Sequence, residues 1–531
     1  MSYRLAPSEK KENMKKLIAL LLILTLCLTG CDMLGSIIGG DAIGNNTQGG
    51  GNQTLIDPED CTSHADSDDD GYCDLCREYV IVVIDLYSIN DLHGKVSSSN
   101  TQPGLAVLTS YLDSVLNENS ILLSSGDMWQ GTAESSLSHG NILTDWMNDM
   151  GFVAMTVGNH EYDWGQDRIR ENDAISAMPF LGINVYDNAT GERADYVTSS
   201  VVVERGGVQI GIIGAIGDCY SSISGEVSGD FYFKVRGELT SLVKAESERL
   251  RKEGVDFIIY SLHDGYDQSM SGIKDIANNK ISSYYDVSLS NGYVDIVFEA
   301  HTHQSYILRD VYGVYHMQGS GENKGLSHAE IGVNSANGNS YVDTVELVDY
   351  KDWGNQSQHS VVDALLLKYK DVIDRANEAL GNNPKYRDDT DVEQLVADLY
   401  YQYGVEKWGE EYDIVLGGGF LRTRSPYNLY AGNVTYSSLF SLLPFDNEIV
   451  LCTIKGRDLK SKFINTNNSD YYVSYGDYDI SSIDDNATYY VVTDTYTSTY
   501  KYNNLTEVAR YAPEVYARDL VADFVKKGGW S

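Results

Sequence analysis

Short runs of hydrophobic residues recur along the first two thirds of the chain, and each leads into polar residues that can bind metal. The runs cover residues 80–84, 121–125, 154–157, 257–262 and 294–299, and their largely apolar character favours buried strands. The motifs that follow are Asp91-x-His93-Gly94, Gly126-Asp127, Gly158-Asn159-His160-Glu161-Tyr162-Asp163, His263-Asp264 and His301-Thr302-His303. Because loops at strand ends build the sites of α/β proteins, we expect these motifs to converge in a βαβ-type core.

The last third of the chain first shows helical spacing and then returns to strand-like runs. Apolar residues at helical spacing predict a linking helix within residues 360–380 and a second helix across 392–399. Strand-like segments follow at 414–416 and 448–454, the second ending at a predicted turn at 455–456. The three consecutive glycines at 417–419 indicate a turn, or a place where a ligand approaches the backbone.

Composition limits the classes of function that the chain can serve. Its 531 residues carry 39 Lys and Arg against 77 Asp and Glu, which gives a formal charge of −38. This length predicts two or more domains, and 42% hydrophobic residues are enough for packed cores. The acidic balance argues against a nucleic-acid polymer as partner, since such a partner needs a basic face.

The amino-terminal segment predicts a targeting signal. Lysines precede the apolar run 17–28, which is too short to cross a bilayer. The run ends in Leu28-Thr29-Gly30-Cys31, which resembles the bacterial lipoprotein cleavage box. The resemblance implies a signal peptide over residues 1–31, a lipid on Cys31, and an extracytoplasmic protein anchored by that lipid to the bacterial cell membrane. An ordinary cleaved signal is the alternative, and Met14 is an alternative start.

Residues 32–78 predict a flexible tether that carries a small cation-binding insert. The stretch 35–54 is rich in Gly, Asn, Thr and Gln, which is typical of a spacer. A C-x2-H-x8-C-x2-C pattern then has the ligand spacing that structural zinc prefers, and alternating aspartates inside it resemble the start of a calcium loop. The residues concerned are Cys61, His64, Cys73 and Cys76 for zinc, and Asp66, Asp68 and Asp70 for calcium. A disulfide in an acidic linker is the third interpretation.

Two further cysteines lie in apolar, strand-like surroundings. Cys219 and Cys452 are predicted to be small core residues, although a disulfide between them stays open at this point.

The order of the metal-binding motifs resembles the calcineurin-like metallophosphoesterases. The blocks D-x-H-G, G-D-x-x-x-G-T, G-N-H-E-Y-D and H-T-H are similar to those of the 5′-nucleotidase branch, and the glycine run with Arg422 and the P-F-x-N element resemble its C-terminal domain. The resemblance implies an α/β protein of two domains. A four-layer α/β/β/α sandwich would occupy residues 79–350, a linker helix 351–380, and a smaller α+β substrate-binding domain 381–531.

The same resemblance implies a site for two divalent metal ions such as zinc or manganese. One ion would be bound by Asp91, His93, Asp127 and His303, and the other by Asp127, Asn159, His263 and His301. A hydroxide bridging the ions would attack phosphorus. His160 would donate to a phosphoryl oxygen or to the leaving group, and Asp163 would orient His160. Ala300 departs from the family, which usually has glycine before the His-x-His motif.

The C-terminal domain of that family closes over a nucleoside, which implies a substrate pocket here. Phe445 would stack on the base and Asn447 would contact it, while Arg387 and Arg422 would reach substrate oxygens. Tyr500 or Tyr502 would supply a second stacking ring from the Tyr-rich stretch 493–502. An exposed strand is the alternative interpretation of this stretch.

Together these features predict an enzyme that converts 5′-nucleotides to nucleoside and phosphate. The same ligand blocks also suit a 2′,3′-cyclic-nucleotide phosphodiesterase or a UDP-sugar hydrolase, because all need the same phosphoryl electrostatics. A non-catalytic nucleotide-binding lipoprotein is a more distant alternative. The sequence indicates no obligate protein partner.

Overall fold

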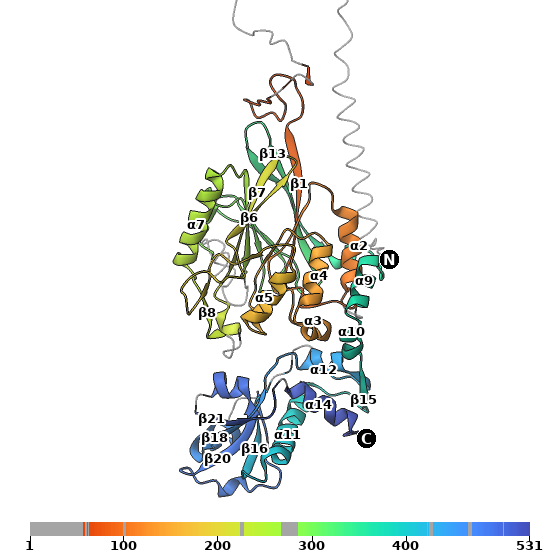
Figure 1. Cartoon of the computed structure of the whole chain (residues 1–531), viewed down its shortest axis with the longest axis vertical. Coiled ribbons are helices and arrows are strands. Elements are labelled where there is room, and N and C mark those ends of the chain that lie inside the picture. The colour runs from red at the N-terminus through yellow and green to blue at the C-terminus, as the bar shows by residue number, and fades with distance from the viewer. Residues whose placement is uncertain are drawn as a thin grey trace, which may run out of the picture. The chain divides into compact units, whose positions relative to one another are not determined.

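The structure is a computed structural model of the whole chain (Figure 1). It describes residues 57–58, 61, 63–98, 102–223, 228–266, 285–421, 423, 428–465, 470–502, 504–513 and 515–530, and for Tyr500 only the backbone. The predicted signal peptide with Cys31, most of the tether, and Arg422 lie outside these residues. The chain from Leu55 to Ser531 forms one structural unit. Within the described part of the chain, no helix has the length and hydrophobicity that crossing a bilayer requires.

Two six-stranded sheets form the centre of the amino-terminal domain. The first has the order β14 (Ser340–Asp349), β13 (Gly325–Asn334), β1 (Ile81–Ile89), β2 (Ile121–Ser124), β3 (Ala154–Thr156) and β4 (Phe180–Leu181). The second has the order β11 (Tyr306–Arg309), β12 (Tyr315–Gln318), β10 (Ile296–Glu299), β9 (Phe257–His263), β7 (Val208–Ile216) and β6 (Ser200–Arg205). Alternate residues of both sheets share one hydrophobic core, including Ile84, Leu123, Ile259 and Phe298.

Helices cover the outer faces of both sheets, so the domain has four layers. The other strand residues of the first sheet, such as Tyr87 and Leu122, share a core with α2 (Leu105–Val115), α4 (Asn141–Asp149) and α5 (Gln166–Ile175). The second sheet packs against α7 (Gly237–Lys252). Strands buried on both faces read as continuous apolar runs, which is why the sequence revealed them. The expected α/β/β/α sandwich is confirmed. Shorter elements are α3 (Ala133–Leu137), β5 (Val185–Asp187) and β8 (Phe231–Phe233).

The carboxy-terminal domain is smaller and is built on a mixed five-stranded sheet. Its order is β19 (Tyr471–Ser474), β16 (Ile414–Phe420), β20 (Thr488–Asp494), β18 (Ile449–Lys455) and β21 (Thr506–Arg510). The helices α11 (Asp389–Trp408) and α14 (Ala517–Lys526) share a core with this sheet. The strands β15 (Ala379–Asn383) and β17 (Gly432–Thr435) form a separate pair, and α12 (Tyr436–Leu442) follows β17.

Several local expectations for this half of the chain differ from the structure. The predicted linking helix is two helices, α9 (Ser360–Lys368) and α10 (Lys370–Ala376), followed by β15. The predicted turn at 455–456 is the start of α13 (Gly456–Leu459), which continues into a π-helix at Lys460–Ile464. The Tyr-rich stretch ends β20 and then forms a second π-helix, Thr497–Lys501, instead of an exposed strand.

The glycine run lies inside strand β16 and serves close packing. A Cβ on Gly417 would lie 2.2 Å from the backbone nitrogen of Tyr401, and one on Gly419 would lie 2.5 Å from Oγ1 of Thr497. Gly418 has a φ of +140°, which a side chain rarely permits. The groups that approach these glycines therefore belong to the protein itself and not to a ligand.

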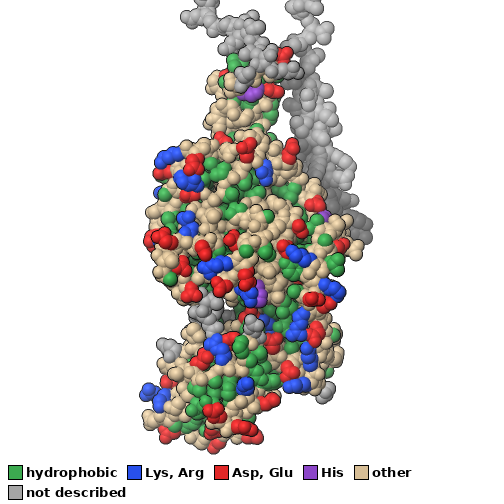
Figure 2. All heavy atoms as spheres, in the orientation of Figure 1, with side chains coloured by type: hydrophobic (Ala, Val, Ile, Leu, Met, Phe, Trp, Pro, Cys, Tyr) green, Lys and Arg blue, Asp and Glu red, His purple; other side chains and the backbone are tan. Residues whose placement is uncertain are grey.

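Charged side chains of both signs are interspersed on the face shown in Figure 2. Cys219 and Cys452 are both buried free thiols, so the disulfide that the sequence left open is absent.

Candidate active site

The predicted metal ligands converge at the carboxyl ends of strands from both sheets. Asp91 and His93 follow β1, Asp127 follows β2, and Asn159 follows β3, whereas His263 ends β9 and the His301–His303 segment follows β10. Three overlapping groups have ligand atoms within 4.8 Å of one another: Asp91, His93 and His303; His93, Asp127 and His160; and Asp91, Asp127 and His263. His301 joins through His263, with ring centroids 5.3 Å apart. The loops at this one edge of the domain thus bring all seven predicted ligands together.

The backbone at these positions is held in an uncommon conformation. The φ angles of five of the ligands are positive, between 49° and 70°, in a region that side chains rarely adopt. The five are Asp91, His93, Asp127, His301 and His303. Strain of this kind persists only where the surrounding structure enforces it, and it concentrates at functional sites.

Hydrogen bonds orient two of the imidazoles so that their lone pairs point into the cluster. His93 donates from Nδ1 to the carbonyl of Gln130 at 2.8 Å, and His263 donates from Nδ1 to the carbonyl of Ser125 at 2.8 Å. Because a carbonyl only accepts, Nε2 of each ring is the unprotonated atom of the neutral imidazole. This is the arrangement in which the outer hydrogen bond fixes the tautomer of a metal ligand.

The two Nε2 atoms face a third imidazole nitrogen, a carboxylate oxygen and an amide oxygen. Nε2 of His93 lies 3.0 Å from Nε2 of His303. Nε2 of His263 lies 3.3 Å from Oδ2 of Asp127 and 3.2 Å from Oδ1 of Asn159. Nδ2 of Asn159 is buried without a partner among the described residues. The amide therefore places its oxygen in the cluster while its NH2 group makes no hydrogen bond. Ring nitrogens, a carboxylate oxygen and an amide oxygen that converge in this way need a proton or a metal cation between them, so this donor set fits divalent metal ions.

The electrostatics of the cluster show the same requirement for positive charge. Burial opposes ionisation of Asp127, but the facing His263 and His160 hold the pKa of its carboxyl well below the usual range. Burial also disfavours the charged form of His263, yet the Asp127 carboxylate raises the pKa of His263 to about 10. Burial and the charge of His263 lower the pKa of His301 to about 4. A buried carboxylate of this kind attracts either a proton or a metal ion to its neighbours.

Glu161 organises the backbone around Asp127, a role that the sequence did not reveal. One carboxylate oxygen accepts from the backbone nitrogens of Asp127 at 2.9 Å and Gly158 at 2.7 Å, and the other accepts from Met128 at 2.8 Å. Burial, followed by the charge of Asp127, raises the pKa of Glu161 to about 7. In the sequence, Glu161 is marked only by its place in the G-N-H-E-Y-D block, and this block does not show what the carboxylate contacts.

Asn90 plays the corresponding part for Asp91. It is buried, and its amide donates to Oδ2 of Asp91 at 2.7 Å and to the carbonyl of Gly319 at 3.1 Å. The amide therefore fixes the orientation of the Asp91 carboxylate.

His160 and Asp163 form the pair that the sequence predicted. Nδ1 of His160 lies 2.8 Å from Oδ2 of Asp163, and the His160 ring lies edge-on to His93 with centroids 5.1 Å apart. Burial raises the pKa of Asp163 despite the opposing effect of His160. Asp163 therefore fixes the orientation of the His160 ring beside the predicted metal ligands.

Ala300, where the resemblance leads us to expect glycine, lies in the buried loop after β10. It is fully buried, and its nitrogen donates to the carbonyl of Asp264 at 3.0 Å. Glu299 beside it is also buried, where it pairs with Nδ1 of His316 at 3.0 Å and accepts from the hydroxyl of Tyr306. This polar network between β10, β11 and β12 anchors the strand that delivers His301.

One loop of the carboxy-terminal domain lies against the loops that carry the cluster. Gln130 donates to the carbonyl of Pro444 at 3.4 Å, and the indole of Trp164 donates to Asp446 at 3.0 Å. Phe445, between these contacts, is 47% exposed. The ring is therefore accessible in a loop that borders the metal-ligand cluster.

Arg518 holds this loop, and nothing in the sequence pattern pointed to it. It is buried at the start of α14, donates to the carbonyl of Phe445 at 3.1 Å, and pairs with Asp446. Its guanidinium lies over the ring of Phe440. Arg518 is far along the chain from the loop, so only the fold brings the two together.

The remaining predicted substrate residues lie in varied surroundings. Asn447 is half-buried in the same loop as Phe445. Arg387 donates to Oδ1 of Asn383 at 3.1 Å and lies over the Trp530 ring. Tyr502 is buried in the core beside Phe463, with ring centroids 5.5 Å apart. Arg422 and the side chain of Tyr500 are outside the described residues.

Family models match the two domains separately. Residues 86–305 match the calcineurin-like phosphoesterase model, and residues 372–481 match the model of the 5′-nucleotidase C-terminal domain.

Three curated relatives are each 25% identical to this chain. Over 71% of the chain it is similar to protein UshA of Yersinia enterocolitica, of which 75% is covered. Over 73% it is similar to an apyrase of Tabanus yao, of which 73% is covered. It is also similar, over 71% of its length, to endonuclease YhcR of Bacillus subtilis, but it spans only 32% of that longer protein.

Solved structures agree on the fold. A putative 5′-nucleotidase from Staphylococcus aureus superposes with a TM-score of 0.62 at 17% identity, covering 84% of this chain and 96% of that one. A 5′-nucleotidase precursor from Thermus thermophilus gives a TM-score of 0.60 at 17% identity with the same coverage. At this identity the likeness establishes the two-domain architecture alone.

Proposed function

Because this chain belongs to the calcineurin-like phosphoesterases that carry a 5′-nucleotidase C-terminal domain, and is therefore a hydrolase of phosphoesters, we propose that it acts on nucleotides in a metal-dependent reaction outside the cytoplasm. The observation that carries the proposal is the cluster in which His93 and His263, each held through Nδ1 by a backbone carbonyl, turn Nε2 toward His303, Asp127 and Asn159. The preferred reaction is conversion of a 5′-nucleotide to nucleoside and phosphate.

Two groups of side chains would hold the divalent ions. One comprises Asp91, His93, Asp127 and His303, the other Asp127, Asn159, His263 and His301, with Asp127 common to both. When bound, such ions stabilise the negative charge that develops on phosphoryl oxygens and make water a stronger nucleophile. Imidazole, carboxylate and amide ligands suit both zinc and manganese, so the ligand types do not discriminate between the two metals.

Residues of the chain supply the orientation and the proton transfer. Glu161 and Asn90 hold the two aspartate ligands in place before a substrate arrives, which removes reorganisation from the reaction. We assign Nε2 of His160 as the donor to a phosphoryl oxygen or to the leaving group, with Asp163 fixing the other ring nitrogen.

The Phe445 loop would bind the nucleoside. An exposed aromatic ring beside the cluster can stack on any base, and Asn447 would add a polar contact. Arg518 acts through the loop as a positioning residue. Arg387, Arg422 and Tyr500 stay in the proposal on the family resemblance, whereas Tyr502 is left out because its ring is buried.

The proposed location rests on the sequence before residue 32. The apolar run 17–28 and the Leu28–Cys31 box support secretion and a lipid anchor on Cys31. Treatment of cells with a radiolabelled fatty acid tests the anchor, because the label should enter the wild-type chain and be lost in Cys31→Ser.

A substrate panel tests the reaction. AMP, UMP, a 2′,3′-cyclic nucleotide, UDP-glucose and p-nitrophenyl phosphate should be compared with and without a chelator. We expect chelation to remove every activity and AMP or UMP to be preferred among the nucleotides. Preference for the cyclic nucleotide or for UDP-glucose would establish one of the alternative reactions, and no turnover with added metal would refute the enzyme.

The role of Phe445 has a separate test. Loss of a stacking ring costs about 1–3 kcal/mol, so Phe445→Ala should raise KM for AMP by roughly 5- to 150-fold while leaving KM for p-nitrophenyl phosphate unchanged. Tyr430→Ala is the matched control, since Tyr430 is an exposed ring elsewhere in the same domain. Equal losses on both substrates would mean that Phe445 supports the fold and does not bind the base.

A further inference from the structure

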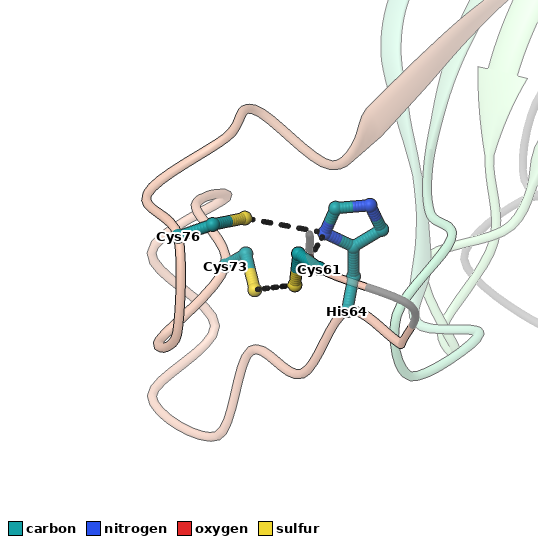
Figure 3. Close-up of side chains that lie close together, drawn as sticks. All are labelled: Cys61, His64, Cys73 and Cys76. Atoms are coloured by element: carbon teal, nitrogen blue, oxygen red, sulfur yellow. Dashed lines mark hydrogen bonds between the residues drawn. The ribbon is translucent and has the colours of Figure 1, made fainter. Parts of the chain in front are cut away.

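Four side chains converge in the insert that precedes strand β1. Figure 3 shows the sulfur atoms of Cys61, Cys73 and Cys76 and the ring nitrogen Nδ1 of His64 turned toward one another. All four ligand atoms lie within 4.8 Å of each other, and Cys73 and Cys76 are buried. The insert stands at the amino end of β1, above β1 and β13 in Figure 1.

The distances between these atoms are those of the edges of a zinc tetrahedron. With Zn–S near 2.3 Å and Zn–N near 2.0 Å, a tetrahedral site has S···S edges of about 3.8 Å and S···N edges of about 3.5 Å. Nδ1 of His64 lies 3.8 Å from the sulfur of Cys61 and 3.5 Å from that of Cys76. The sulfurs of Cys61 and Cys73 are 4.0 Å apart.

The same distances disagree with a disulfide. A disulfide bond joins sulfurs at about 2.05 Å, roughly half the observed separation of Cys61 and Cys73. The three cysteines of the insert are free thiols. Three sulfurs around one imidazole also leave an odd thiol in any disulfide scheme, whereas they complete a four-ligand set for zinc.

Neighbouring groups support the ligands as they do in metal sites. The backbone nitrogen of Leu75 donates to the sulfur of Cys73 at 3.4 Å, a contact that stabilises a thiolate. On the outer side of the imidazole, Nε2 of His64 faces the Glu78 carboxylate at 3.5 Å. A carboxylate there favours the tautomer in which Nδ1 carries the lone pair.

The aspartates of the insert shape its loop. Asp66 accepts from the backbone nitrogens of Asp70 and Gly71 and from the amide of Asn334 at the end of β13. Asp70 accepts from the backbone of Tyr72 and pairs with Arg77. The Asp66 and Asp70 oxygens, which a calcium ion would need, are therefore engaged in holding the loop closed and docked on the β13–β14 turn.

We propose that Cys61, His64, Cys73 and Cys76 bind one structural zinc ion that fixes the segment entering strand β1. Four protein ligands close the coordination sphere, which is the mark of a structural site rather than a catalytic one. Strand β1 has nine residues and so separates the insert from Asp91 by roughly 30 Å. The zinc takes no part in the phosphoesterase reaction, and the inference stands whether or not the proposed substrates are right.

Metal analysis of the full chain tests the site, with Asp127→Ala as background to remove the catalytic ions. In that background we expect one zinc per chain, and none after the further changes Cys73→Ser and Cys76→Ser. Reconstitution with cobalt(II) should give an intense thiolate-to-cobalt absorption that the same two changes abolish. Cys219→Ala is the matched control. Cys219 is a free cysteine outside the insert, beside His263 and His301, so both signals should remain when it is replaced.

Two further measurements keep the proposal open to refutation if the double serine variant fails to fold. His64→Cys should retain the zinc, since four cysteines also form a tetrahedral site, whereas His64→Ala should lose it. A mercurial reagent added to the wild-type protein should release zinc in proportion to the thiols that it modifies. Equal zinc content with and without the cluster cysteines, or a disulfide found by mass spectrometry without reductant, would overturn the inference.

Discussion

The two ends of strand β1 carry two clusters of metal-binding side chains with opposite chemistry. The first cluster, after Ile89, consists of carboxylates, imidazoles and an amide at the edge of two sheets. The second cluster, before Ile81, consists of three sulfurs and one imidazole in a short loop. Five ligands of the first cluster have positive φ angles, whereas none of the four in the second does. The first is built under strain by the fold, and the second is built by local turns.

If both proposals hold, this difference separates a catalytic site from a structural one. Mixed oxygen and nitrogen ligands leave room for substrate oxygens on the ions, and they depend on distant residues such as Glu161 for their geometry. Thiolates close the coordination sphere, so their ion needs no substrate and exchanges slowly. If the two clusters are separate sites, a change in one should leave the metal content of the other unaltered.

Removal of the shared ligand should have the largest effect. Asp127→Ala takes one carboxylate from both catalytic ions, so we expect turnover of p-nitrophenyl phosphate to fall to background and the catalytic metal content to fall with it. The zinc of the cysteine cluster should remain. Steady-state kinetics and metal analysis of the same sample measure both, with the exposed Asp371→Ala as control. Unchanged metal content in Asp127→Ala would refute the assignment of Asp127 as a shared ligand.

Chelation should reproduce this loss in a reversible form. Dialysis against a chelator should remove the activity with the catalytic ions first and leave about one zinc per chain, because a closed thiolate site releases its ion more slowly. Added zinc or manganese should restore turnover. If zinc of the cysteine cluster left at the same rate as the activity, the two clusters would not differ in the way we infer.

Glu161→Gln should weaken the catalytic cluster without removing a ligand. Both oxygens of Glu161 accept backbone N–H groups, and a glutamine would turn an NH2 group toward two of these donors. Loss of such outer contacts typically costs about 10–100-fold in metal affinity or activity. We expect a decrease of that size in kcat, partly restored by excess metal, and no change in the cysteine-bound zinc. A variant with wild-type kcat and metal affinity would show that the Asp127 loop keeps its geometry without the Glu161 carboxylate.

The hydrophobic pattern predicted the strands of the amino-terminal domain because they are buried on both faces, whereas their four-layer arrangement came from the family resemblance. Runs such as 257–262 are largely apolar, and each ends at a motif whose residue types already indicate metal binding. The seven residues that the family resemblance proposes as ligands converge at one edge of the domain. The cysteine cluster was also visible, since C-x2-H and C-x2-C spacings are local.

What the sequence did not reveal are contacts between residues that are far apart in the chain or that depend on backbone shape. Arg518 reaches the Phe445 loop only through the packing of α14, and the glycines of β16 are required by the backbones that pack against them. The Tyr-rich stretch has strand-like composition but forms a π-helix, because Asp494 accepts from the backbone nitrogen of Thr497 and turns the chain there. Such tertiary preferences override local propensity.

The smallest effect we expect is that of Glu78→Gln in the cysteine cluster. Glu78 is 53% exposed and contacts no ligand sulfur, but it faces the outer nitrogen of His64 at 3.5 Å. Removing its charge should leave the zinc bound and make it transfer to a chromogenic chelator a few times faster, because solvent screens most of the interaction. The transfer rate is followed by absorbance in the Asp127→Ala background, with the exposed Glu410→Gln as matched control. Identical rates in Glu78→Gln and Glu410→Gln would mean that the thiolates alone hold the ion, and the comparison would then rest on the sulfur ligands without any help from the outer carboxylate.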